Sequence, residues 1–279
     1  MKYITLVFAC FLSMISLDIQ AQSYRIATFN LRFDNASDSG NLWKDRSPFA
    51  MELIRFHDFD IFGTQEALIH QLEDVSRVLP GYARIGVGRA DGKEGGEFSA
   101  IFYKKDRFKL LKKGDFWLSE TPDKPSLGWD ATCCNRICSW GLFQDSGNGK
   151  RFYVFNVHFD HQGKTARVES ARLMLRKINE IAGGQPVILT GDFNGDHDSE
   201  WYRILETSAL LKDTYKEVRY PYITNSTYHD FGRELGGSSV IDHIFISKHF
   251  RTVKWGVLTD SYAGKYPSDH FPVVADLQW

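Results

Sequence analysis

The sequence predicts an α+β fold, an α/β sandwich in which two mixed β-sheets pack face to face with helices outside, giving four layers. Short apolar strand segments recur along the chain, some separated by amphipathic helical segments and others joined as hairpins. With 43% hydrophobic and 14% aromatic residues, the chain can bury a large core. No internal repeat or Pro/Gly/Ser-rich linker interrupts residues 22–279, so we expect a single domain.

Residues 1–21 differ in character from the rest of the chain. Lys2 gives a positive start, residues 4–17 are mostly apolar, and Ala21 offers a small residue at a plausible cleavage point. This is the layout of a signal peptide, and the apolar stretch is shorter than the roughly 20 residues of a spanning helix. An uncleaved membrane anchor is the alternative. We expect an exported protein, periplasmic or secreted, that is monomeric and has no stable membrane insertion after cleavage.

Strands are expected wherever a short apolar run ends at a polar or turn-forming residue. They are residues 23–32, 59–67, 97–108, 136–143, 151–160, 185–194, 239–247, 252–260 and 271–279. Two helices are expected between them. Residues 68–79 follow the second strand and end before a Pro-Gly turn, and residues 164–184 place apolar side chains on one face before a Gly-Gly stop.

Three cysteines remain once Cys10 leaves with the signal peptide: Cys133, Cys134 and Cys138. No second cysteine pair exists elsewhere in the sequence, so a structural zinc held by cysteines is not expected. In an exported protein, one local disulfide and one leftover thiol are the ordinary outcome. We expect Cys138 to pair with Cys133 or Cys134.

Polar side chains stand at the ends of several apolar strands. They are Asn30, Glu66, His158, Asp192, Asn194, Asp242, Asp269 and His270. Each alone could be a turn residue or a buried, hydrogen-bonded histidine, but strand ends on one rim of a sandwich lie close together. Oxygen donors without thiolates favour Mg²⁺, for which Mn²⁺ can substitute. Two histidines beside carboxylates can move protons near neutral pH, so the group suits hydrolysis of a phosphate ester.

Six motifs in this order, TFNLR, TQEA, FNVHFDH, GDFN, IDHIF and SDHFPV, resemble the endonuclease/exonuclease/phosphatase superfamily over nearly all of residues 22–279. The segment WLSETPDKPSLGWDA, followed by RICSW, is similar to a little-defined branch of secreted bacterial proteins. The resemblance implies that Glu66 binds the metal with Asn30 assisting, and that Asp269 binds the phosphate or a second metal. It also implies that Asp192 orients or activates the attacking water, and that Asn194 holds the scissile phosphate.

The same resemblance implies a proton-transfer group. His270 is similar to the catalytic histidine of the superfamily, and Asp242 to the carboxylate that orients its ring. His158 resembles a second histidine found in the nuclease and sphingomyelinase branches. Glu97 resembles the carboxylate that pairs with that second histidine.

The charge balance bears on the substrate. With 34 Lys plus Arg against 35 Asp plus Glu, the chain lacks the basic excess typical of general nucleic-acid binding, and its one dense basic stretch, residues 104–113, is expected to be a solvated hairpin. Aromatic and arginine side chains in three loops are expected to wall a pocket. They are Trp43, Trp129, Tyr228, His229 and Phe231, with Arg46, Arg136 or Arg233 holding a phosphate.

We therefore expect a small or terminal phosphate ester as substrate; nucleic acid is possible but not favoured. A nuclease and a sphingomyelinase-like phospholipase are the alternatives within the enzyme class. The alternative from another class is a non-catalytic binding domain on the same fold.

Overall fold

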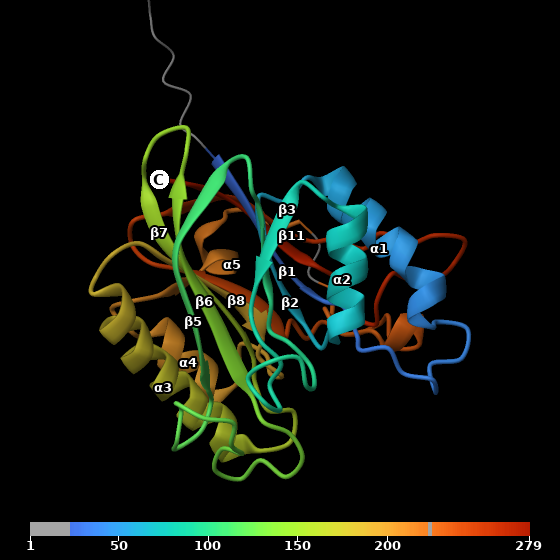
Figure 1. The fold of residues 1–279 in the computed structure, drawn as a ribbon, viewed down its shortest axis with the longest axis horizontal. Coiled ribbons are helices and arrows are strands. Elements are labelled where there is room, and N and C mark those ends of the chain that lie inside the picture. Colours follow the sequence, from blue (N-terminus) through green and yellow to red (C-terminus); the bar gives the residue numbers. More distant parts are fainter. Residues whose placement is uncertain (1–22, 223–224) are drawn as a thin grey trace, which may run out of the picture.

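The structure, a computed structural model, describes residues 23–222 and 225–279. Over these ranges, two six-stranded sheets pack face to face and the long helices cover their outer faces (Figure 1), which confirms the predicted fold class. The expected signal peptide, residues 1–21, lies outside the described residues. Among the residues that are described, no helix is both long enough and apolar enough to span a bilayer.

The first sheet has the strand order β11-β12-β1-β2-β4-β3, in which β1 runs parallel to β2 and antiparallel to β12. Its strands are β1 (Ser23–Asn30), β2 (Ile61–Gln65), β3 (Tyr82–Ile85), β4 (Ile101–Lys104), β11 (Arg251–Val257) and β12 (Val273–Gln278). Helices α1 (Trp43–His57) and α2 (Ile69–Val78) cover its outer face. Side chains such as Phe29 and Phe62 pack against Leu53 and Leu72 of these helices.

The second sheet has the order β5-β6-β7-β8-β10-β9, with β7 and β8 parallel. Its strands are β5 (Phe108–Trp117), β6 (Ile137–Asp145), β7 (Arg151–His158), β8 (Val187–Asp192), β9 (Lys212–Asp213) and β10 (Asp242–Ile246). Helices α3 (Lys164–Ala182) and α4 (Glu200–Glu206) cover the outer face of this sheet. A short helix α5 (Thr214–Glu217) and a 3₁₀ helix η1 (Asp230–Gly232) complete the described chain.

Two expectations about local structure are wrong. Residues 43–57 form helix α1, whereas a pocket-wall loop was expected around Trp43. Residues 104–113 are not a hairpin, because β4 belongs to the first sheet and β5 to the second, so this segment crosses between the sheets. It does so at the edge where β1 begins, and there Arg107 Nη2 donates to the carbonyl of Ser23 (2.9 Å).

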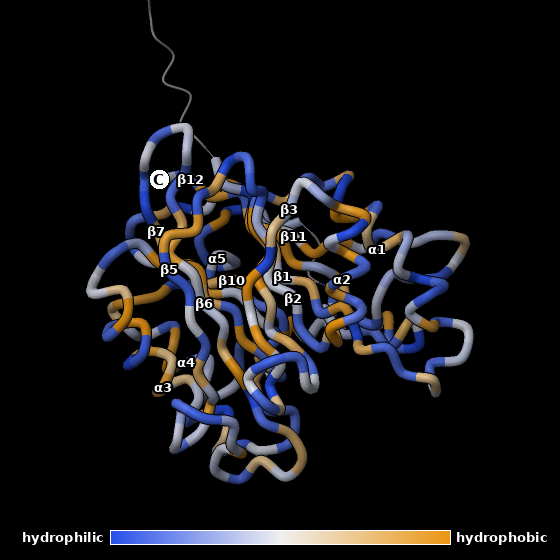
Figure 2. Tube along the Cα trace, viewed as in Figure 1, coloured by the Kyte–Doolittle hydropathy of each residue, from blue (hydrophilic) through white to orange (hydrophobic). Residues whose placement is uncertain are grey.

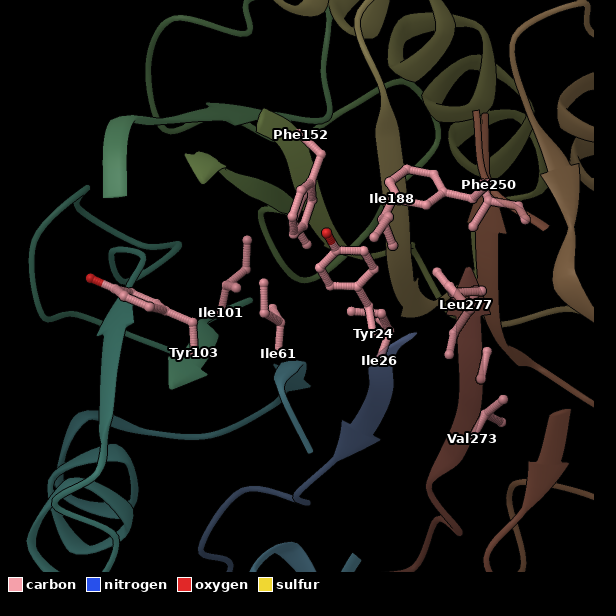
Figure 3. Packing of buried hydrophobic residues seen from close by; sticks show 14 of the residues in the cluster. Tyr24, Ile26, Ile61, Ile101, Tyr103, Phe152, Ile188, Phe250, Val273 and Leu277 are labelled. Atoms are coloured by element: carbon pink, nitrogen blue, oxygen red, sulfur yellow. The ribbon is translucent and has the colours of Figure 1, made fainter. Parts of the chain in front are cut away.

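Alternation along each strand divides its side chains between two environments. In β1, Tyr24 and Ile26 point between the sheets, where they meet Phe152, Val154 and other apolar side chains in a fully buried core (Figure 3). The hydropathy colouring follows this arrangement, with apolar segments in the strands and polar ones in the outer loops (Figure 2). Burial of this core is the main driving force for joining the two sheets.

A polar layer lies between this core and the carboxyl ends of the parallel strands. It consists of Thr28, Gln65, Asn156 and Thr190, all fully buried. Asn156 Oδ1 accepts from Gln65 Nε2 (2.7 Å) and Thr190 Oγ1 (2.9 Å), and its Nδ2 donates to the carbonyls of Thr64 and Ala100. The layer therefore links the two sheets by hydrogen bonds.

Gly63 makes this link possible. A Cβ at this position would lie 2.2 Å from Asn156 Oδ1, so any larger residue would push the sheets apart at the polar layer.

Candidate active site

The polar strand ends converge as predicted, because register places them side by side. Asn30 ends β1 and Glu66 directly follows β2, its parallel neighbour. In the second sheet, Asp192 is the register partner of both His158 and Asp242. All of these side chains lie next to the polar layer, on its side away from the apolar core, at the same end of the sandwich.

One group of donors is suited to a metal ion. Carboxylate oxygens of Glu66 and Asp192 and a ring nitrogen of His270 lie within 4.8 Å of one another. The two carboxylates are the candidate ligands, because the His270 ring is protonated on both nitrogens, as described below. Asn30 Nδ2 donates to Glu66 Oε1 (3.1 Å) and Asp192 Oδ2 (3.0 Å), while its Oδ1 accepts from the backbone of Arg32. Asn30 is therefore at the expected place, but it presents its amide nitrogen and orients the carboxylates.

The carboxylates of this group are crowded, and their raised pKa values show that a positive charge is needed among them. Burial and then the charge of Asp242 raise the pKa of Asp192 to about 7. Burial also raises the pKa of Asp269 to about 6, with a contribution from Glu66. A hard divalent cation bound between these oxygen atoms would remove the repulsion between them. The residues thus fit a site for a divalent metal ion.

His270 and Asp242 form a buried pair. His270 Nδ1 lies 2.9 Å from Asp242 Oδ2, and both side chains are at most 5% exposed. Burial would lower the pKa of His270, but Asp242, followed by Asp192 and Asp269, outweighs burial and raises it to about 10. The ring is consequently an imidazolium at neutral pH, with Nε2–H directed toward Asp192 at 3.9 Å.

His158 has the opposite character. Asn194 Nδ2 donates to the carbonyl of Phe159 and to His158 Nε2 (both 3.0 Å), so this nitrogen is an acceptor. Burial and then nearby arginines lower the pKa of His158, and its ring is neutral. Its Nδ1 lies 4.0 Å from Glu97 Oε2, which places Glu97 where the resemblance predicts it. Burial raises the pKa of Glu97 to about 7, despite its ion pair with Arg89 (2.6 Å).

These groups line an open cavity of about 490 Å³, and Arg32, Arg89 and Arg136 line it with them. Arg136, expected to bind substrate, is on its wall, where its Nε pairs with Asp160 (3.2 Å). Its Nη1 is buried and has no hydrogen-bond partner in the part of the chain that the structure describes. Tyr228 also lines the cavity, with its ring 5.2 Å from that of His270.

Three cationic or polar residues on the same wall were not predicted: Arg32, Arg89 and His161. The sequence motifs could have indicated two of them, because Arg32 is the last residue of TFNLR and His161 the last residue of FNVHFDH. Arg89 lies in a Gly-rich loop without any such signal. Arg32 lies 3.7 Å from both Glu66 and Asp269, so it partly balances their charge.

Backbone conformation helps to aim two of the site residues. Glu66 has φ 64° and Asn194 has φ 50°, both in the left-handed region. Asparagine tolerates this region, whereas for glutamate it costs about 1–3 kcal/mol. Such strain is concentrated at functional sites, and here it turns Glu66 out of its strand toward the cavity.

Several expected substrate-binding residues do not line this cavity. Arg46 is fully buried in α1 and donates to the backbone carbonyls of Leu31, Arg32 and Pro267, so it holds loops together. His229 is also buried, stacked on Phe271 at 3.8 Å.

The remaining corrections concern residues that pack or point elsewhere. Trp43 is buried and donates to Asp74 (2.9 Å), and Phe231 lies over Arg46. Trp129 packs against the core under α3 and α4. Arg233 is exposed and pairs with Asp230 in its own turn.

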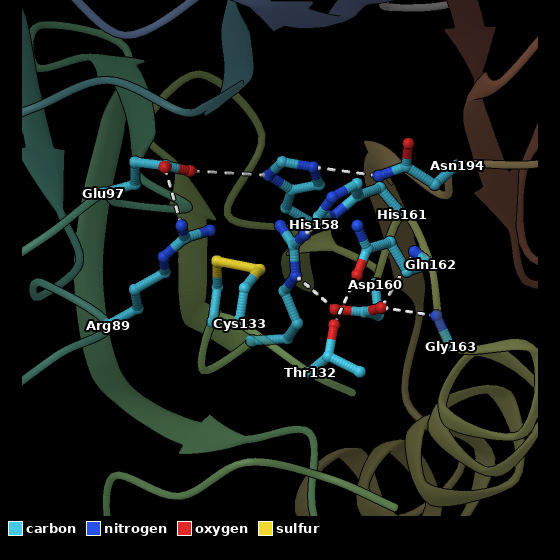
Figure 4. The surroundings of a disulfide bond; sticks show 12 residues. Arg89, Glu97, Thr132, Cys133, His158, Asp160, His161, Gln162, Gly163 and Asn194 are labelled. Carbon is cyan, nitrogen blue, oxygen red and sulfur yellow. Dashed lines mark hydrogen bonds and ion pairs between the residues drawn. A yellow bond between two sulfur atoms is a disulfide. The ribbon is translucent and has the colours of Figure 1, made fainter. Parts of the chain in front are cut away.

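The cysteines also differ from expectation. Cys133 and Cys134 form a disulfide with each other, which we call the vicinal pair, and it lies on the cavity wall near Arg89 and Glu97 (Figure 4). Cys138 is buried within β6 and is a free thiol in the described structure. It cannot reach the vicinal pair because its side chain belongs to the core beneath α3.

The fold and this site define a metal-assisted phosphoesterase, and comparison with known proteins identifies the family. Residues 27–270 match the model of the Endonuclease/Exonuclease/phosphatase family, so the chain belongs to this family and is a hydrolase acting on phosphoester bonds. The superfamily predicted from the motifs is confirmed.

Three relatives illustrate the similarity. The structure of mannosyl-6-phosphatase Bt3783 from Bacteroides thetaiotaomicron is 49% identical, covers 92% of this chain and 100% of that chain, and has a TM-score of 0.89. A family member from Bacteroides vulgatus is 41% identical, with coverages of 92% and 99% and a TM-score of 0.88. Human Nocturnin is 24% identical over 265 residues, covering 85% of this chain but only 58% of Nocturnin.

Proposed function

We propose that the protein is an exported, Mg²⁺-dependent phosphomonoesterase that removes phosphate from a small phosphorylated sugar. The observation that carries the proposal is the cavity, in which the carboxylate and histidine group lies beneath a wall of Arg89, Arg136 and His161. A wall of this kind can enclose a compact polar substrate and hold it by hydrogen bonds. The similarity to a mannosyl-6-phosphatase supports a sugar phosphate. Export rests on the signal-peptide layout of residues 1–21.

The site residues divide the chemistry among them. A divalent cation held by Glu66 and neighbouring carboxylates supplies charge neutralisation of the phosphate. Asp192 lies within reach of Glu66 and His270 and takes the proton from the attacking water. His158, hydrogen-bonded to Asn194, lies beside Asp192 (3.6 Å), and both residues line the cavity there.

His270 acts on the other side of the reaction. Its imidazolium carries a proton on Nε2 and donates it as the bond between phosphorus and the leaving oxygen breaks. Asp242 keeps the ring charged and fixed in orientation. The products are a free alcohol and inorganic phosphate.

Long nucleic acid fits the surface less well. The one dense basic stretch, residues 104–113, begins at the edge where β1 begins and continues into the first part of β5. Several of its charges are already paired, since Lys104 and Arg107 both contact Asp60. None of residues 104–113 lines the cavity, so the stretch does not contact a substrate bound there.

A phosphate-release panel tests the proposal. Sugar phosphates, beginning with mannose 6-phosphate, are compared with inositol phosphates, nucleotides, sphingomyelin, single-stranded RNA and plasmid DNA in the presence of Mg²⁺. We expect the highest kcat/KM for a sugar monophosphate, and loss of that activity in Asp192→Asn. Faster hydrolysis of RNA, DNA or sphingomyelin than of every sugar phosphate would overturn the assignment.

The cationic wall gives the panel a second readout. Arg136→Ala should raise KM for the sugar phosphate more than it lowers kcat, because Arg136 lines the cavity with an Nη1 that has no partner among the described residues and is not one of the carboxylate or histidine groups that carry the chemistry. Arg233→Ala is the matched control, since Arg233 is exposed and outside the cavity. Equal effects of the two substitutions would remove the cationic wall from substrate binding.

A further inference from the structure

A second cluster of metal-ligating side chains lies on the opposite face of the second sheet. His243 follows Asp242 in β10, so its side chain points away from the cavity, toward the helical layer. There it meets Asp213 of β9 and His197 from the loop after β8. One ligand atom from each of the three residues lies within 4.8 Å of the others.

The hydrogen-bond partners fix which ring nitrogens carry protons. His197 Nδ1 lies 2.6 Å from Asp196 Oδ1, and His243 Nε2 lies 3.3 Å from the carbonyl of Gly195. Both oxygens can only accept, so both nitrogens are N–H donors. If both rings are neutral, His197 Nε2 and His243 Nδ1 carry no proton. They lie 3.6 Å and 3.1 Å, respectively, from Asp213 Oδ2. Three electron-rich atoms therefore converge, and a cation must lie between them or protons must be added to the rings.

At His197 the distance favours a metal ion over an added proton, whereas the 3.1 Å between His243 Nδ1 and Asp213 Oδ2 fits either. A protonated His197 would close on the Asp213 carboxylate to about 2.7–2.9 Å. Its Nε2 instead stays 3.6 Å away and, among residues 23–222 and 225–279, has no hydrogen-bond partner although it is buried. Zinc bonds of about 2.0–2.2 Å in a tetrahedron place ligand atoms about 3.3 Å apart, and the two separations from Asp213 Oδ2 bracket this value.

The partners of the rings are those that metal-bound histidines have. A ligating histidine usually donates its other ring N–H to a carboxylate or a backbone carbonyl, as His197 and His243 do here. Tyr202 Oη donates to the Asp213 carboxylate (3.0 Å) and steadies it in the same way. Two imidazoles and one carboxylate suit Zn²⁺, whereas the oxygen-rich catalytic group suits Mg²⁺.

We propose that His197, Asp213 and His243 bind one Zn²⁺-like divalent cation at a structural site separate from the catalytic centre. Such an ion would join the loop after β8 to β9 and β10. The same loop carries Asn194, and β10 carries Asp242, so the ion would brace two active-site elements from behind.

Zinc titration of the full chain tests this site without measuring activity. The protein is stripped with a chelator, dialysed into excess Mg²⁺ to saturate the oxygen-donor site, and titrated with Zn²⁺ by calorimetry. We expect one Zn²⁺ per chain, with at least about 10-fold weaker binding in His197→Ala. His57→Ala is the matched control, because His57 also pairs with an aspartate, at 3.1 Å, and is 22% exposed against 25% for His197.

Two further variants keep the result decisive. Glu66→Gln alters the catalytic group alone and should still bind one Zn²⁺, so failure of the proposed catalytic site is distinguishable from failure of this one. If His197→Ala does not fold, Asp196→Asn removes the partner of His197 at a partly exposed position and should also weaken binding. Absence of stoichiometric Zn²⁺ in the wild-type protein, or unchanged affinity in the folded His197 or Asp196 variant, would overturn the proposal.

Discussion

Asn156 is the residue on which the joining of the two sheets depends most sharply. It is fully buried, and all four hydrogen-bonding positions of its amide are used. Asn156→Leu keeps the number and branching of side-chain heavy atoms while deleting every hydrogen bond. The substitution therefore separates the polar layer from simple packing.

The magnitude follows from the partners. Four hydrogen bonds worth about 1 kcal/mol each give about 4 kcal/mol. Three partners keep or regain another bond. Gln65 also donates to Thr28, and the Ala100 carbonyl also accepts from the Thr64 backbone N–H. Thr190 Oγ1 can turn its single O–H to the carbonyl of Phe155. We therefore expect the free energy of unfolding to fall by about 3 kcal/mol, a large part of the 5–15 kcal/mol of an ordinary domain.

Urea unfolding followed by far-UV circular dichroism measures this change. Val154→Ala is the control, because Val154 lies two residues away on the same face of β7, is equally buried and makes only apolar contacts. It should cost about 1–3 kcal/mol through its cavity, without unpaired polar groups. A loss below about 1 kcal/mol for Asn156→Leu would refute the view that the polar layer holds the sheets together.

Four further outcomes are expected. Excess chelator should abolish phosphoesterase activity, and Mg²⁺ or Mn²⁺ should restore it in the wild type but poorly in Glu66→Gln; full activity in chelator would contradict the metal site. His270→Ala should lower kcat about 100-fold or more. Asp242→Asn should lower the pKa of His270 from about 10, so that the rate falls with rising pH from a lower pH than in the wild type; an unmoved alkaline limb in kcat against pH would exclude the pair. Alkylation followed by mass spectrometry should find one thiol, Cys138, and only after unfolding, whereas three thiols would rule out the vicinal pair.

Much of the fold was predictable because strand and helix periods are local properties of the sequence. Helix α1 was not predicted, and its sequence explains why. It contains Pro48, and its N-cap, Leu42, offers no side chain that could bond the first turn. Its stability comes instead from tertiary packing, since residues such as Ala50 and Ile54 are buried against the first sheet.

The centre of the site was predictable for a different reason. His158 and Asp192 each end an apolar run, and parallel pairing of β7 with β8 brings such ends together. The cavity wall was not predictable. Arg89 lies in a loop whose path depends on contacts distant in sequence, such as the hydrogen bond from Trp117 Nε1 to the carbonyl of Arg89 (2.8 Å). The prediction that Arg46 binds phosphate was wrong for the same reason, because its neighbours in the sequence do not indicate that backbone carbonyls surround its guanidinium.

The two proposed metal sites, on opposite faces of the second sheet, can both be explained by the charges and donor atoms on each face. On the cavity face, a set of four acidic side chains lies close to only two cationic ones. They are Glu66, Asp192, Asp242 and Asp269, with Arg32 and His270. The excess of two negative charges is what one divalent cation balances, and burial makes that balance strong because water cannot screen it. On the far face, Asp213 with its two histidines presents nitrogen donors instead of an excess of oxygen, so the two proposed sites favour different ions.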